Sequence, residues 1–201
     1  MKKLTFRYSS MNAGKSRNLI STYYNYKELH LNPIIVVPNI IKNKKVVSRT
    51  GEELDAISFY ELLYEADINN IDCILIDEAH MLSKNEVIYL NDITIEFDIP
   101  VICYGLRTDF KGDTFEGSNY LLGIADSLEE LPTLCGCGRK ARMNLRLING
   151  EVDKSQDSTL KLREEENVSY ISMCRECYRD AIGGYKDIKD MNIYDNALVT
   201  K

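Results

Sequence analysis

Residues 9–16 combine a glycine, a lysine and a serine in an order that suits phosphate binding. The segment reads Ser9, Ser10, Met11, Asn12, Ala13, Gly14, Lys15 and Ser16. Gly14 lets the main chain turn its amide groups toward an anion, and a helix that begins here adds the positive end of its dipole. Lys15 can reach the outer phosphates of a nucleoside triphosphate, and the Ser16 hydroxyl can ligate Mg²⁺. The segment therefore predicts a phosphate-binding loop, with Ser9 standing where the first glycine of such loops is usual.

An acidic pair, Asp77 and Glu78, directly follows the apolar run 73–76. An acid at the carboxyl end of a parallel strand lies at the edge of the sheet where ligands bind. Asp77 is expected to hold Mg²⁺, directly or through water, and Glu78 to orient or deprotonate a nucleophile. His80 is expected to lie against the nucleotide without acting as the base. The same letters mark a class of helicases, but a helicase needs two such domains and this chain is too short for both.

Four of the six cysteines form two close pairs, Cys135 with Cys137 and Cys174 with Cys177. In a reducing compartment, paired cysteines next to glycine are more often metal ligands than disulfides. Four thiolates suit a closed, tetrahedral, structural zinc site. Cys73 and Cys103 lie inside apolar stretches and are expected to be small buried hydrophobic residues.

The elements that must position these residues alternate between apolar runs and helical stretches. Runs suited to strands lie at residues 4–8, 33–38, 72–76 and 101–104, and helical stretches at 14–29 and 83–97. This alternation predicts an α/β fold with a parallel sheet and right-handed crossovers. The phosphate loop then follows the first strand, and the acidic pair ends the third. The polar segment 42–52 is expected to be a mobile loop.

The character of the sequence changes near Leu134. Short strand-like pieces at 144–148 and 169–173 lie between the cysteine pairs, and the charged stretch 151–167 is expected to be a loop. The predicted division is an α/β nucleotide-binding domain at 1–133, a zinc-binding domain at 134–180, and a C-terminal tail at 181–201. Because the tail has no hydrophobic periodicity, it is expected to be disordered.

The composition is that of a folded protein that binds neither duplex nucleic acid nor membranes. Its 201 residues include 25 basic and 31 acidic side chains, for a net charge of −6. Duplex binding without sequence preference needs a basic face, which this balance disfavours. No apolar run approaches the roughly 18–20 residues of a membrane span. The N-terminal residues lack the apolar core of a signal peptide, so a cytoplasmic protein is expected.

Five sequence blocks in this order resemble the type II, zinc-containing thymidine kinase family, in its bacterial and viral branch. The blocks are residues 8–16, 77–80, 104–110, 135–141 and 170–177, and the resemblance covers about residues 1–180. It implies a P-loop NTPase-like parallel sheet flanked by helices, followed by a small zinc-ribbon-like domain called the lasso. It also implies transfer of the γ-phosphoryl group of ATP to the 5′-hydroxyl of thymidine, with deoxyuridine as the second acceptor, to give dTMP in nucleotide salvage.

The resemblance also implies roles for individual residues. Glu78 matches the catalytic base of the family, and Asp77 matches the acid that helps to place Mg²⁺. ATP and its phosphates would be bound by residues 9–16, Asp77 and His80. The nucleoside pocket would consist of Met11, Leu106, Phe110, Phe115, Asn144 and Tyr170. A structural Zn²⁺, a homotetramer and feedback inhibition by dTTP are further expectations from the family.

This chain departs from the family pattern at two places. His80 stands where the family usually carries glutamine, and Glu164, Glu165 and Glu166 stand where its substrate loop usually has a pair of glycines. Two other functions fit the motifs taken singly: a P-loop ATPase with an unknown acceptor, and an ATPase whose zinc ribbon is a switch that binds nucleic acid. ATP consumption that depends on added thymidine distinguishes the kinase from both.

Overall fold

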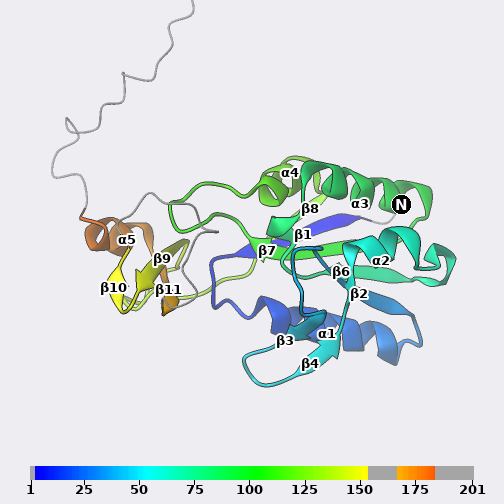
Figure 1. The fold of residues 1–201 in the computed structure, drawn as a ribbon, viewed down its shortest axis with the longest axis horizontal. Coiled ribbons are helices and arrows are strands. Elements are labelled where there is room, and N and C mark those ends of the chain that lie inside the picture. The colour runs from blue at the N-terminus through cyan, green and yellow to red at the C-terminus, as the bar shows by residue number, and fades with distance from the viewer. Residues whose placement is uncertain (1–2, 154–166, 184–201) are drawn as a thin grey trace, which may run out of the picture.

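The computed structural model describes residues 3–153 and 167–183, and its main feature is a six-stranded parallel sheet (Figure 1). The strand order is β5-β2-β6-β7-β1-β8. Their bounds are β1 Leu4–Ser9, β2 Pro33–Val37, β5 Ile57–Ser58, β6 Cys73–Ile76, β7 Val101–Leu106 and β8 Ser127–Glu130. The predicted α/β fold with a parallel sheet is therefore confirmed.

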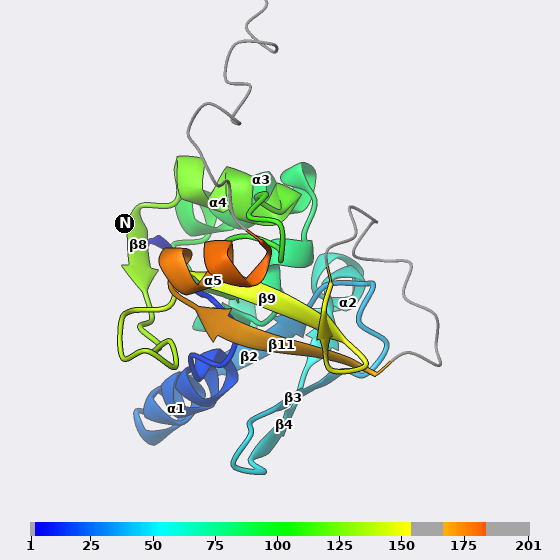
Figure 2. The same ribbon diagram turned by 90° about the vertical axis from the view of Figure 1, so that its left-hand side faces the viewer.

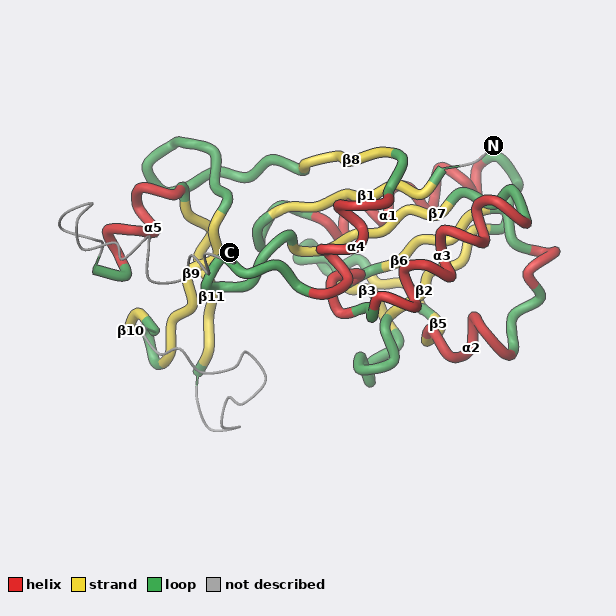
Figure 3. The backbone as a smooth tube through the Cα atoms, turned by 90° about the horizontal axis from the view of Figure 1, so that it is seen from above, coloured by secondary structure: helices red, strands yellow, loops and turns green. Residues whose placement is uncertain are grey.

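Helices cover both faces of this sheet. Alternate residues of its strands point to opposite sides, and because apolar residues lie on both sides, both faces need to be covered. The helix α1 (Lys15–Glu28) packs on one face, and α2 (Phe59–Tyr64), α3 (Lys84–Glu96) and α4 (Glu116–Ile124) pack on the other (Figures 1 and 3). In β6, Ile74 and Ile76 join the core beneath α3, whereas Cys73 and Leu75 join the core beneath α1. Cys73 and Cys103 are both fully buried, as the sequence predicted.

Local sequence sets the start of each main helix. Ser83 caps α3, since its hydroxyl accepts a hydrogen bond from the Glu86 N–H at 3.4 Å. The Glu86 carboxylate accepts one from the Ser83 N–H at 2.7 Å, which completes a capping box. At α1 the preceding residue is Gly14, which has a φ of 72°. That left-handed conformation is cheap only for glycine and turns the chain from the phosphate loop into the helix.

The helix α4 packs very closely on the one-turn helix η2 (Ala79–Met81), which follows the acidic pair. The contact is made by Gly117, where a Cβ atom would lie 2.5 Å from the carbonyl oxygen of Ala79 and 2.7 Å from that of Leu82. Another single turn, η1 (Ile68–Asn70), precedes β6. Among the described residues, no helix is long and apolar enough to cross a membrane.

The segment predicted to be a mobile loop, residues 42–52, is instead largely a β-hairpin. Its strands are β3 (Lys45–Val47) and β4 (Glu53–Asp55), and an ion pair joins Lys45 to Glu53 across them. Val46 is 1% exposed because it packs into the core beneath α1. A single buried valine among polar residues is too weak a periodic signal, which explains why the prediction was wrong.

A second, antiparallel sheet lies beside the carboxyl edge of the first (Figure 2). Its order is β10-β9-β11, with β9 at Met143–Ile148, β10 at Glu151–Val152 and β11 at Val168–Met173. The helix α5 (Arg175–Ala181) follows. The predicted strands at 144–148 and 169–173 thus correspond to β9 and β11. The predicted loop at 151–167 begins with β10, and its residues 154–166 lie outside the described part, as do residues 184–201 of the predicted tail.

Candidate active site

One cavity of about 720 Å³ opens where β1, β6 and β7 end, and it collects most of the candidate residues. Its walls include Met11, Asn12, Ala13, Gly14, Lys15, Ser16, Glu78, His80, Leu106, Phe110, Phe115, Asn144 and Tyr170. Ser9, Ser10 and Asp77 are buried directly behind these walls. The size suits a small-molecule site. The two motifs and the proposed nucleoside pocket therefore share a single space.

The phosphate loop places its lysine at the floor of this cavity. Nζ of Lys15 donates to Oγ of Ser9 at 3.1 Å and to the carbonyl oxygen of Ser10 at 3.2 Å. Burial lowers the pKa of Lys15, while the charges of Glu78 and Asp77 oppose that shift. The ammonium group is thus held beside the first turn of α1, where an anion would meet both a positive charge and free main-chain amides.

Asp77 forms hydrogen bonds on both sides of its carboxylate. Oδ2 accepts from Oγ of Ser16 at 3.3 Å, and Oδ1 accepts from the N–H of Glu78 at 3.0 Å. Burial raises the pKa of Asp77, and these hydrogen bonds and Lys15 act in the opposite direction. A hydroxyl and a carboxylate that converge in this way are the oxygen donors that Mg²⁺ prefers. Ser16 and Asp77 therefore fit the role of its protein ligands.

Glu78 projects into the cavity from a left-handed main-chain conformation with a φ of 52°. Burial among the cavity walls, and then the negative charge of Asp77, raise its pKa to about 7, while Lys15 opposes the shift. Solvent still reaches 43% of the side chain, so a proton has a route in and out. A carboxylate with this pKa is matched to accepting a proton near neutrality.

His80 is a neutral wall residue. Burial lowers its pKa to about 3, so its approach of 3.4 Å to Oε2 of Glu78 is not an ion pair. Its Nδ1 accepts a hydrogen bond from the Leu106 N–H at 3.3 Å, and its ring meets the Phe115 ring edge-on at a centroid distance of 4.5 Å. Through these two contacts His80 braces two walls of the predicted nucleoside pocket.

Asn144 joins the small sheet to the large one. Its Oδ1 accepts from the Met11 N–H at 2.7 Å, and its Nδ2 donates to the Thr108 carbonyl at 3.0 Å. Ser172 donates its hydroxyl to the Met11 carbonyl. The phosphate loop is therefore fixed at Met11 by both β9 and β11, which brings Tyr170 of β11 to the same cavity.

Several residues of the walls were not predicted from the sequence. They are Arg17, Ile41, Val47, Ser48, Arg49, Thr50, Met81 and Asp109. Four of these belong to the unpredicted β3–β4 hairpin and its turn. Arg17 and Arg49 add further cations to Lys15, and Arg49 is hydrogen-bonded to the side chain of Asn12 in the phosphate loop. The local sequence signal of a turn here was the glycine at position 51. In the structure Gly51 has a φ of 88°, which is easy only for glycine.

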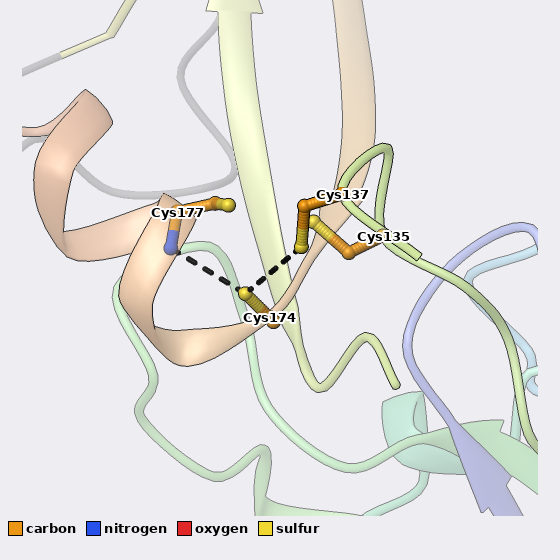
Figure 4. A group of neighbouring side chains, drawn as sticks. All are labelled: Cys135, Cys137, Cys174 and Cys177. Carbon is orange, nitrogen blue, oxygen red and sulfur yellow. Dashed lines mark hydrogen bonds between the residues drawn. The ribbon is translucent and has the colours of Figure 1, made fainter. Parts of the chain in front are cut away.

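The four paired cysteines form a separate cluster between the β9–β11 sheet and α5 (Figure 4). Their sulfur atoms all lie within 4.8 Å of one another, and the Cys137 and Cys174 sulfurs are 3.7 Å apart. A tetrahedral zinc ion with bonds of about 2.3 Å would separate its sulfur ligands by roughly 3.8 Å. The Cys177 N–H also donates to Sγ of Cys174. The cluster could therefore hold a metal ion, and its all-sulfur donor set suits zinc.

One predicted feature lies outside the described residues. The predicted substrate loop with Glu164, Glu165 and Glu166 falls within residues 154–166. The neighbouring Asn167 is described, and its N–H donates to Oδ1 of Asn149 at 3.2 Å.

Comparison with known proteins agrees with this geometry. The profile of the family described as "Thymidine kinase" matches residues 2–178. The "Thymidine kinase" of Haemophilus influenzae is 44% identical over 194 residues, which cover 91% of this chain and 99% of that protein. Those of Shewanella oneidensis (44% over 192 residues, 90% and 99%) and Rhodopirellula baltica (42% over 193 residues, 90% and 90%) are similar. The chain therefore belongs to the thymidine kinase family.

Proposed function

We propose that this protein transfers the γ-phosphoryl group of ATP to the 5′-hydroxyl of thymidine, with deoxyuridine as a second acceptor. The observation that carries the proposal is the single cavity shared by the phosphate loop, Glu78 and a set of apolar and aromatic walls. An ATPase without a nucleoside acceptor would need no such walls. The names of the similar proteins support the same activity. We propose that the reaction takes place in the cytoplasm, where ATP is available as the donor.

The phosphate end of the site would bind ATP. Lys15 and the main-chain amides at the start of α1 would hold the transferring phosphates, and Arg49 lies on the opposite hairpin to neutralise further charge. Ser16 and Asp77 would hold Mg²⁺, which supplies charge neutralisation on the phosphates when bound. Catalysis at this end is electrostatic positioning, since most of the developing charge is on phosphate oxygens.

Glu78 would act as the general base. As the 5′-oxygen of the nucleoside bonds to the γ-phosphorus, its proton passes to the Glu78 carboxylate. The bond from the γ-phosphorus to the bridging oxygen breaks, and ADP leaves with that electron pair. The raised pKa of Glu78, about 7, suits a group that must both accept and release this proton.

The apolar walls would bind the thymine ring. Met11, Leu106, Phe110 and Phe115 offer hydrophobic surface, and Asn144 and Tyr170 add polar groups. A flat, weakly polar ring needs walls of this kind, with a few hydrogen bonds to its edge. His80 would position the nucleobase through its contacts with Leu106 and Phe115, and it would take no part in proton transfer.

The remaining proposals concern zinc, domains and assembly. Cys135, Cys137, Cys174 and Cys177 would bind one structural Zn²⁺, and residues 134–180 would form the domain that depends on it. The resemblance to the family supports a homotetramer and inhibition by dTTP. Neither nucleic acid nor a membrane is proposed as a partner, in keeping with the net charge of −6.

The direct test is a panel of nucleosides with ATP and Mg²⁺. We expect ADP release to require a nucleoside, with thymidine the best acceptor, deoxyuridine second and dTMP as the product by mass. ATP hydrolysis at the same rate without nucleoside, or stimulated by DNA, would contradict the proposal.

A further inference from the structure

Arg146 is a fully buried cation that the proposed reaction does not use. It lies on β9 and is 1% exposed. Its guanidinium carbon is 3.6 Å from the centroid of the Phe110 ring, so the guanidinium group lies directly over the face of that ring. At this distance the two groups are in van der Waals contact, and the contact is cation–π in character.

Asp153 holds this guanidinium group in place. Oδ2 of Asp153 accepts from Nε of Arg146 at 2.5 Å and also pairs with Nη2. The Asp153 N–H donates in return to the Arg146 carbonyl oxygen at 3.0 Å. Within the described residues, Nη1 of Arg146 has no hydrogen-bond partner. Among the described residues, one carboxylate and one aromatic ring therefore define the position of the guanidinium group.

The register of the small sheet directs Arg146 toward the cavity walls. Tyr170 of β11 is directly opposite Arg146, and Ser172 is opposite Asn144. Directly opposed residues, and residues two apart on one strand, share a face of a sheet. Asn144 and Ser172 both bond to Met11, so this face is the one that meets the phosphate loop. Arg146 thus lies on the same face as one cavity wall, Tyr170, and in contact with another, Phe110.

The part of the chain that carries the paired cysteines, from residue 134 onward, also holds Phe110 at a second point; it is called the cysteine-bearing part below. The Tyr178 hydroxyl, on α5, donates to the Phe110 carbonyl oxygen. The ring is thus fixed by Arg146 and the main chain by Tyr178. A buried ion pair is by itself weak evidence for stability, because its desolvation cost offsets its attraction. The close contact with the face of the Phe110 ring gives the buried charge a more specific purpose.

We propose that Arg146 is a positioning residue for the nucleobase, which fixes the Phe110 ring as a wall of the cavity. This inference rests on the function proposed above. If it is right, loss of the Arg146 guanidinium group weakens nucleoside binding and reduces the discrimination between thymidine and deoxyuridine. Both depend on the position of the Phe110 ring. ATP binding and the chemical step, which involve other walls, are largely unaffected.

The test is Arg146→Lys, which keeps a cation for Asp153 but has no planar group to cover the ring. We expect KM for thymidine to rise about tenfold. We also expect the preference for thymidine over deoxyuridine to fall, with kcat and KM for ATP within about twofold of the wild type. The matched control is Arg139→Lys, in the same part of the chain, where an exposed arginine pairs with Glu176. It should leave all of these constants unchanged.

A double-mutant cycle tests whether Arg146 acts through the ring. In a Phe110→Leu background the further change Arg146→Lys should have no additional effect on KM for thymidine, because the surface it covers is gone. If Arg146→Lys does not fold, as judged by its melting curve, the cycle is run with Asp153→Asn. That change leaves the guanidinium group in place beside a neutral acceptor, and a smaller rise in KM is expected.

An unchanged KM for thymidine in a folded Arg146→Lys protein would overturn the proposal, as would full additivity in the cycle. A uniform fall in kcat with both KM values preserved would indicate a structural role instead and would also overturn it. Failure of the proposed function is a different result, because the wild type would then not phosphorylate thymidine at all.

Discussion

The large parallel sheet and the small cysteine-bearing part are stabilised in different ways. The first has two extensive cores on opposite faces, which include fully buried residues such as Phe6, Phe59 and Leu90. In the second, the hydrophobic cluster consists of Cys135, Ala141 and Cys174, with Met173 and Cys177 packed against it. Burial of so little apolar surface contributes little to folding. We therefore propose that this part is stabilised by its contacts with the large sheet and by a metal bound to its thiolates.

The two parts nevertheless form one site. The large sheet supplies the phosphate loop and the acidic pair, and the β3–β4 hairpin beside it supplies Arg49; these are the groups that we propose act on phosphate. The small part supplies Asn144 and Tyr170 directly and holds Phe110 from behind. With the function proposed above, this difference would amount to a division of roles: the well-packed part would carry the chemistry, and the cysteine-bearing part would shape the pocket for the acceptor.

Loss of the metal should unfold the small part and leave the large sheet folded. We expect about one Zn²⁺ per chain by elemental analysis. Cys177→Ser should lose the metal and the structure of the small part, because binding at such sites is worth on the order of 10 kcal/mol. Thymidine phosphorylation should disappear while the unfolding transition of the large sheet persists in calorimetry.

The control for this prediction is Cys73→Ala, which removes a buried thiol from β6 without touching the cluster. It should retain the full metal content. Zinc-free protein that is fully folded and active would contradict the four-thiolate site.

Glu78→Gln should have the next largest effect, confined to the chemical step. It keeps the shape of the side chain and removes the oxygen that accepts the proton, so kcat should fall by about 10²–10⁴-fold. ATP affinity, measured by calorimetry, should be little changed, since Lys15 and the loop amides remain. Glu96→Gln, an exposed carboxylate at the end of α3, is the matched control. Normal turnover by Glu78→Gln would transfer the base role to another group.

Lys15→Ala should lower turnover by on the order of 10²-fold, because it removes a charge from the transferring phosphates. The melting temperature should not fall, because the charges of Glu78 and Asp77 offset only part of the cost of burying the Lys15 ammonium group. Lys27→Ala, in the exposed last turn of the same helix, should behave as the wild type. Steady-state kinetics with saturating thymidine measure the effect, and near-normal activity would remove the phosphate-loop assignment.

The smallest expected effect is on stability alone. Ser83→Ala breaks the capping box of α3 and should destabilise the large part by about 1 kcal/mol in urea unfolding. Zinc content should be unchanged, and Ser83→Asn, which keeps a capping oxygen, should be close to neutral. A loss of metal in Ser83→Ala would show that the two parts are more tightly coupled than their cores suggest.

The parts of this site that could be predicted from sequence are those whose chemistry lies within a few consecutive residues. The phosphate loop, the acidic pair and the cysteine pairs are of this kind, and the strands that precede the first two are alternating or wholly apolar runs. The pocket residues Leu106, Phe110, Phe115 and Tyr170 came from resemblance, because no spacing rule brings such scattered residues to one cavity.

What could not be predicted depends on tertiary packing. In the β3–β4 hairpin and its turn, Val46 and the polar Ser48 are buried among exposed residues, so the sequence shows no clear hydrophobic alternation, and Arg49 was missed with it. Arg146 reads as an exposed charge on a short strand. Only the fold shows that Asp153 compensates it and that Phe110 covers it. Buried polar groups of this kind leave no mark on local hydropathy.

The contact of Gly117 with η2 has a consequence for how this sequence can vary. Even a methyl group at this position would overlap the Ala79 and Leu82 carbonyl oxygens, so α4 or the turn would have to move. The turn also carries Glu78 and His80, and a shift there would misplace the carboxylate relative to the phosphates. Position 117 therefore tolerates few substitutions, in evolution or in engineering, although this residue does not line the cavity. A library that randomises α4 should recover active clones almost only with glycine at this one position.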